Sequence, residues 1–174
     1  MANKVASLDP SGIGIEMEAD KPSWYDALNG LPGLLGSSIS ETFELKRLTQ
    51  FLLDAFNQLA LTGQDKIYIF EELASFISAL THILSSEKNP YAYWVKSNAA
   101  KEHYRQCVRE GIEGAEAQVT LAEVKTFLQL VSTKTQKAIQ RAKDPKGFLR
   151  TYFYHEVTRY ESLNGSVQQK MTYV

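Results

Sequence analysis

The chain has 174 residues, of which 44% are hydrophobic and 22% charged, and its formal net charge is −1 at pH 7. These values are typical of a globular domain with its own core and exclude a disordered chain. The near-neutral balance argues against nucleic acid or an anionic membrane as the main partner. A single cysteine, Cys107, excludes an internal disulfide and is compatible with a reducing cytoplasm. Because no run approaches the roughly 18 apolar residues of a membrane span, and the N-terminus lacks the apolar core of a secretory signal, we expect a cytoplasmic protein.

The first segment of the chain, residues 1–15, shows little periodicity. Asp9 opens an Asp-Pro-Ser-Gly run that is typical of a turn. From Ile13 onward apolar and charged residues alternate, which predicts a short extended segment with Glu16 and Glu18 on one side. These two carboxylates either face the same cavity as the loop that follows or are simply solvated.

Residues 20–38 form an unusual loop that is apolar, aromatic and stiffened by proline. Pro22 and Pro32 fix φ and remove two N–H donors. A long loop of this kind is more often a binding surface than a plain connection. Asp26 lies at its centre beside Trp24 and Tyr25. Partial desolvation would raise the pKa of this carboxyl and suit it to donate a proton near neutral pH.

Most of the next hundred residues are predicted to be helical. Ser38 and Glu41 fit a capping box, and the apolar spacing that follows predicts a helix ending near Gly63. Thr120 and Glu123 form a second capping box ahead of the last helix. The further helices are expected over residues 71–84, 92–110 and 121–142, and the β-prone runs over 66–70 and 118–121.

The run from Thr151 to Glu161 is dense in β-branched and aromatic residues, which predicts a strand. Asn164-Gly165 predicts a turn after it. Because an isolated strand is not stable, we expect a partner from the N-terminal segment or from residues 118–121.

Few motifs in the chain carry recognisable chemistry. The three histidines are far apart in sequence, so no metal site is predicted. His82 and His103 are expected on helix surfaces, whereas His155 is either functional or an ordinary strand residue. No GxSxG elbow or phosphate loop occurs, which leaves the carboxylates. A carboxyl that protonates a leaving oxygen is what glycosidic cleavage requires, and inverting hydrolysis also needs a second carboxylate to activate water.

The run Trp24-Tyr-Asp-Ala-Leu-Asn29 resembles the Trp-Asn-Asp-Cys-Leu-Asn segment of cellobiose-phosphorylase-type enzymes, the inverting glycoside phosphorylases. The longer run from Glu16 to Leu48, and the run from Thr151 to Glu161, resemble large bacterial proteins described as cellobiose-phosphorylase-like. The similarity covers most of the chain, and its specific motifs lie towards the two ends.

This resemblance implies a mainly α fold that is part of an (α/α)6 toroid, with one or two short β-strands. Residues 1–37 would form the active-site loop region of a single partial catalytic domain, 38–145 its helical region and 146–174 a strand-bearing C-terminal segment. The parent enzyme would cleave a β-linked disaccharide or oligosaccharide by inverting phosphorolysis or hydrolysis. In phosphorolysis, inorganic phosphate is the co-substrate and no other cofactor is implied.

The resemblance also assigns roles to individual residues. Asp26 matches the general acid, and Asn29 could hydrogen-bond the sugar or orient Asp26. Trp24 and Tyr25 could present apolar faces to the sugar. Glu16 and Glu18 are further substrate-binding candidates. Glu41 resembles a glutamate that follows the loop in these enzymes, although helix capping explains it equally well.

Two departures from the family pattern affect these assignments. Tyr25 stands where characterised phosphorylases have Asn, and none of the family's phosphate-binding residues is matched.

The remainder of the barrel or another subunit would be the partner, and the isolated chain is expected to be inactive. The alternative is a non-catalytic carbohydrate-binding or protein-interaction helical module whose adhesive surface is formed by Trp24, Tyr25 and the C-terminal tyrosines.

Overall fold

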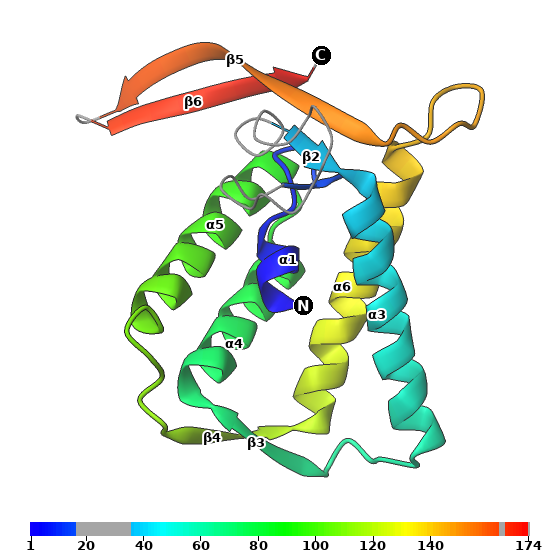
Figure 1. Cartoon of the computed structure of the whole chain (residues 1–174), viewed down its shortest axis with the longest axis vertical. Coiled ribbons are helices and arrows are strands. Elements are labelled where there is room, and N and C mark those ends of the chain that lie inside the picture. The colour runs from blue at the N-terminus through cyan, green and yellow to red at the C-terminus, as the bar shows by residue number, and fades with distance from the viewer. Residues whose placement is uncertain (17–35, 164–165, 174) are drawn as a thin grey trace.

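The computed structural model describes residues 1–16, 36–163 and 166–173. These residues form five helices and two small antiparallel sheets, with the long helices along the long axis of the molecule (Figure 1). The helices are α1 (Ala2–Ala6), α3 (Ile39–Gln58), α4 (Glu71–Ser86), α5 (Pro90–Cys107) and α6 (Leu121–Arg141). The strands are β1 (Ile15–Glu16), β2 (Gly36–Ser38), β3 (Lys66–Phe70), β4 (Glu116–Thr120), β5 (Tyr152–Leu163) and β6 (Ser166–Tyr173).

The core lies among the long helices and the short helix α1. Helix α6 packs against both α3 and α4, α5 packs against α4, and α1 lies against α4 and α5 (Figure 1). Tyr93 is fully buried, and its hydroxyl donates a hydrogen bond of 2.8 Å to the carbonyl of Val5. Other buried apolar side chains of this core include Leu8, Ile15, Phe76, Leu80, Phe127, Leu128 and Val131.

The two sheets lie at opposite ends of the bundle (Figure 1). β3 and β4 pair antiparallel at one end, and the order β1-β2-β5-β6 forms the other sheet. The expected partners of the C-terminal strand were therefore wrong, because β5 pairs with β2 and β6 whereas residues 116–120 pair with β3. β2 was not predicted because its three residues, Gly-Ser-Ser, carry no strand signal.

Most of the predicted helices are confirmed, with one clear error of boundary. Thr120 and Glu123 form the predicted capping box of α6, and Asn89 caps α5 by accepting the N–H of Ala92. Helix α3, however, ends at Gln58 and not near Gly63. Ala60 adopts φ 52° there, and the N–H of Leu61 donates to the carbonyl of Phe56. This is a Schellman-type end built on an alanine, which a search for glycine misses.

The fold class is thus mainly helical with two small antiparallel sheets, and the described residues do not form a toroid. Helix α1 was not predicted, because five residues are too few to show a helical period. None of the helices in these residues contains a stretch long and apolar enough to cross a membrane.

Candidate functional site

The predicted site residues are only partly covered by the structure. Glu16 lies in β1 and Glu41 in the first turn of α3. The remaining ones, namely Glu18, Trp24, Tyr25, Asp26 and Asn29, lie outside the described residues. Residues 17–35 are the motif-bearing segment. The site can be described at the base of this segment, which is the place where β1 ends and β2 begins.

β1 and β2 hold the two ends of residues 17–35 side by side. Ile15 pairs with Ser38 and Glu16 with Ser37 in an antiparallel register. Gly14 allows this close approach, because a Cβ at that position would lie 2.4 Å from Oγ of Ser37. The segment that carries Asp26 thus begins and ends at one point of the fold.

Asp9 stabilises this point from within. Its fully buried carboxylate accepts backbone N–H groups from Ser11 (3.0 Å), Ile13 (2.9 Å) and Gly14 (2.8 Å). Oδ2 also accepts the hydroxyl of Ser37 at 2.6 Å. One side chain therefore fixes the predicted turn after residue 9 and connects it to β2.

His155 of β5 is the third buried polar group here. Its Nε2 lies 3.7 Å from Oδ2 of Asp9, and burial lowers the pKa of the imidazole although the nearby carboxylate opposes this. The cluster is not a nucleophilic triad, because the hydroxyl of Ser37 donates to the carboxylate and not to a basic imidazole nitrogen. Asp9, Ser37 and His155 are all almost fully buried, so we assign them a structural role.

Glu16 is the last described residue before the motif-bearing segment, and its environment is chemically distinct. Burial raises the pKa of its carboxyl, Asp9 adds to that rise, and Trp94 and Lys101 partly offset it. The indole N–H of Trp94 on α5 donates to Oε1 of Glu16 at 2.6 Å. A raised pKa favours the protonated acid nearer to neutral pH, which is the property that proton donors in enzymes share.

A shallow concavity of about 440 Å³ lies beside this cluster and is lined in part by Ser11, Asn89, Tyr91 and Arg141. The ring of Tyr91 lies 5.7 Å from that of Trp94, so the two aromatic side chains form one surface on α5. Arg141 donates to the carbonyl of Ser11 at 2.9 Å. The lining of the concavity therefore combines one aromatic ring, that of Tyr91, with polar and charged groups.

Lys134 is a further basic group near this region, and it is partly withdrawn from water. Nζ of Lys134 lies 3.8 Å from the centre of the Tyr93 ring, in cation–π geometry. Burial, together with repulsion from Arg141 and Lys137, lowers the pKa of Lys134 to about 8. The ammonium group of Lys134 therefore packs against the ring of Tyr93 and is not a fully exposed charge.

Glu41 does not form the helix cap that was expected of it. Oγ of Ser38 accepts the N–H of Ser40, so the capping box predicted for Ser38 and Glu41 is not formed. Oε2 of Glu41 instead pairs with Nζ of Lys4 at 2.8 Å. Its carboxylate therefore links α3 to α1, the helix that the sequence did not predict.

Sequence reasoning missed Asp9, Trp94 and His155 as neighbours of the motif-bearing segment. Asp9 was recognised only as a turn residue, and nothing in the sequence connects Trp94 with Glu16, 78 positions away. His82 and His103 are exposed on α4 and α5, as predicted. Across residues 1–16, 36–163 and 166–173, no group of three or more His, Cys, Asp or Glu side chains could hold a metal ion.

The fold is mainly helical. Its buried polar cluster, which contains Asp9 and Ser37, links the strands at the two ends of the aromatic, proline-bearing segment. Comparison with known proteins adds no family to this description. No protein-family model matches the chain, and no curated protein does so either.

Proposed function

We propose that this chain is part of a carbohydrate-active protein that cleaves a β-linked disaccharide or oligosaccharide. In this proposal Asp26 is the general acid of an inverting phosphorolysis or hydrolysis, and Trp24, Tyr25 and Asn29 bind the sugar. The assignment rests on the resemblance of residues 24–29 to the cellobiose-phosphorylase-type motif. A phosphorylase would take inorganic phosphate as its nucleophile.

The observation that carries the proposal is the arrangement at the base of the motif-bearing segment. The strands on both sides of it are paired, and Glu16, with its raised pKa, lies there beside Trp94. A proton donor of this kind must be held in a fixed place relative to its substrate. The base of the segment therefore supports a site in which Glu16 is a substrate-binding residue.

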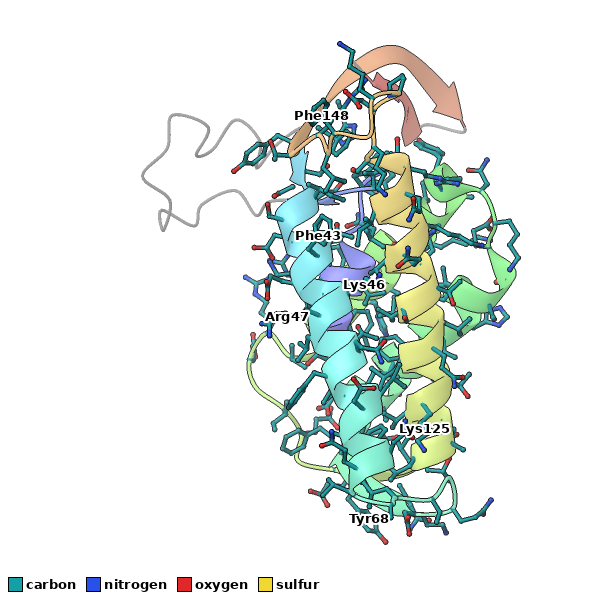
Figure 2. The ribbon with its side chains drawn as sticks, turned by 90° about the vertical axis from the view of Figure 1, so that its right-hand side faces the viewer. Phe43, Lys46, Arg47, Tyr68, Lys125 and Phe148 are labelled. Atoms are coloured by element: carbon teal, nitrogen blue, oxygen red, sulfur yellow. The ribbon has the colours of Figure 1, made fainter. Side chains whose placement is uncertain are left out.

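A larger assembly around this chain is supported by its outer apolar surface. Figure 2 shows Phe43 on the outer side of α3, Tyr68 at one end of the bundle and Phe148 at the other. Phe51 and Leu59 of α3 are 64% and 68% exposed, and Phe148 is 70% exposed. Large apolar side chains exposed along α3 suit a surface that another chain segment covers, and we propose the rest of an (α/α)6 barrel or another subunit.

The test is phosphorolysis of cellobiose by the protein in which this chain is joined to the rest of the proposed barrel. Asp26→Asn keeps the size of the side chain but cannot donate an acidic proton, so we expect the rate to fall roughly 10²–10⁴-fold. Glu110→Gln, at an exposed position far in sequence from the motif, is the control and should leave the rate unchanged. An Asp26→Asn protein that consumes phosphate at the unaltered rate contradicts the proposal.

A second function is favoured by the same exposed side chains, because an apolar surface also suits a non-catalytic module that binds carbohydrate or protein. Sugar binding by the isolated chain distinguishes the non-catalytic module from the enzyme. Binding of cellobiose, measured by saturation-transfer NMR, would then be abolished by Trp24→Ala and unaffected by Asp26→Asn. Sugar binding that fails with Asp26→Asn would instead assign the carboxyl a direct role.

A further inference from the structure

A second cavity lies far from the motif-bearing segment, between α4 and α5. Its volume is about 310 Å³, which is at the lower end of the roughly 300–1,000 Å³ of small-molecule sites. Each helix contributes one stripe, with Glu72, Phe76 and Ala79 on α4 and Ala100, Tyr104 and Cys107 on α5. Glu113 and Ala115, in the connection from α5 to β4, line its remaining side, next to α4 in Figure 1.

The floor of the cavity is apolar and rigid. The rings of Phe76 and Tyr104 are stacked with their centres 4.7 Å apart and their planes 8° from parallel. The cavity exists because Ala79 and Ala100 are too small to fill the space between the two helices. A flat aromatic floor bordered by small residues accommodates the apolar body of a small ligand.

The polar group of the cavity is Glu72. Its Oε1 accepts the backbone N–H of Glu113 at 2.8 Å, and this hydrogen bond lowers the pKa of the carboxyl. The backbone N–H of Glu72 itself lowers this pKa as well, so the carboxylate stays ionised. An ionised carboxylate at the side of an apolar cavity attracts a ligand that carries a positive charge.

The charge of the lining determines what kind of donor fits. Glu71, Glu72 and Glu113 line the cavity together with His103, whereas no lysine or arginine does. Two lysine and arginine residues of α5 are engaged elsewhere, because Lys101 donates to Ser7 and Arg105 pairs with Glu102. The potential in the cavity is therefore negative and favours a cation.

We propose that the cavity between α4 and α5 binds a small organic cation that has an apolar body. The ammonium group pairs with the carboxylate of Glu72, and the body lies on the stacked rings of Phe76 and Tyr104. This site is independent of the proposed carbohydrate function, since it shares no residue with the base of the motif-bearing segment.

The proposal is tested by titrating the ¹⁵N-labelled full chain with 2-phenylethylammonium and following its amide chemical shifts. We expect saturable shifts confined to α4, α5 and residues 111–115. The neutral isostere 2-phenylethanol has the same ring but no charge, so its affinity should be roughly tenfold lower. No saturable shift, or equal affinity for the two probes, overturns the proposal without any substitution being needed.

Variants of the chain then locate the bound cation. Glu72→Gln keeps an acceptor for the Glu113 N–H but removes the charge, and the affinity for the amine should fall roughly tenfold. Glu110→Gln removes a nearby exposed charge that does not line the cavity, and the affinity should stay within about twofold of the unaltered chain. Ala100→Leu fills the cavity and should abolish binding, whereas unaltered amine affinity in Glu72→Gln contradicts the proposal.

Discussion

Glu16 and Glu72 are the same residue type in two regions of the molecule, and the structure shifts their pKa values in opposite directions. Burial beside Asp9 raises the pKa of Glu16 at the end of β1. The hydrogen bond from the Glu113 backbone lowers the pKa of Glu72 between α4 and α5. Glu16 therefore holds a proton to higher pH than an ordinary glutamate, whereas Glu72 stays ionised to lower pH.

The difference shows how the surroundings of a carboxyl determine its use. Loss of water alone favours the neutral acid, whereas a donated N–H favours the anion. The region around Glu16 suits transfer of a proton, and the cavity at Glu72 suits attraction of a cation. The following predictions test this contrast, beginning with the contacts that hold the first region together.

Asp9→Ala should cause the largest loss of stability. The substitution leaves three backbone N–H groups and the hydroxyl of Ser37 buried without their acceptor. We expect the free energy of unfolding, measured by urea denaturation, to fall by about 3–5 kcal/mol. Asp54→Ala, at an exposed position of α3, is the control and should cost less than about 0.5 kcal/mol. A loss below about 1 kcal/mol for Asp9→Ala would show that the cluster does not hold β2 in place.

Trp94→Phe should have the next largest effect, because it removes the indole donor from Oε1 of Glu16. That hydrogen bond lowers the pKa of Glu16, so its loss should raise the pKa further. With Glu16 ionised, the variant should lose about 1–2 kcal/mol of stability. The measurements are the carboxyl ¹³C shift of Glu16 and the urea midpoint, and a lowered pKa would contradict the account.

The buried imidazole of His155 should make stability depend on pH. Burial lowers its folded-state pKa below the ordinary value of 6.5, so the unfolded chain binds the proton more readily. Its contribution is therefore complete above pH 6.5 and is lost as the pH falls from there towards the folded pKa. The loss is about 1.4 kcal/mol for each unit between the two pKa values.

His155→Gln should remove that part of the pH dependence, and urea denaturation at several pH values measures it. His82→Gln changes an exposed histidine of α4 and serves as the matched control. If both variants keep the slope of the unaltered chain, His155 is not the group responsible.

Glu41→Gln should have the smallest effect. Its ion pair with Lys4 is partly exposed, with 53% of the lysine and 31% of the glutamate side chain accessible. Pairs of this kind contribute about 0–1 kcal/mol, so the urea midpoint should hardly change. A loss above about 2 kcal/mol would mean that this contact between α1 and α3 is essential to the fold.

Local signals in the sequence predicted the elements that depend on neighbouring residues. The capping box at Thr120 is such a case, because Thr120 and Glu123 are within three positions of each other. The end of α3 was mispredicted because Ala60, and not a glycine, adopts the left-handed conformation.

The contacts that define the two sites were not predictable in this way. Ser37 reaches Asp9 across 28 positions, and Glu113 reaches Glu72 across 41. Such pairs form only when helices and strands that are distant in sequence pack together. The sequence showed that Asp9 opens a turn and that Glu72 begins a helix, but not which donors each carboxylate would meet.

The most direct test of this contrast is a single pH titration of the side-chain carboxyl carbons by ¹³C NMR. As the pH falls, Glu16 should gain its proton before an ordinary glutamate does, and Glu72 should gain its proton later than both. A chain in which Glu72 is protonated at the same pH as Glu16, or at a higher pH, would contradict the account.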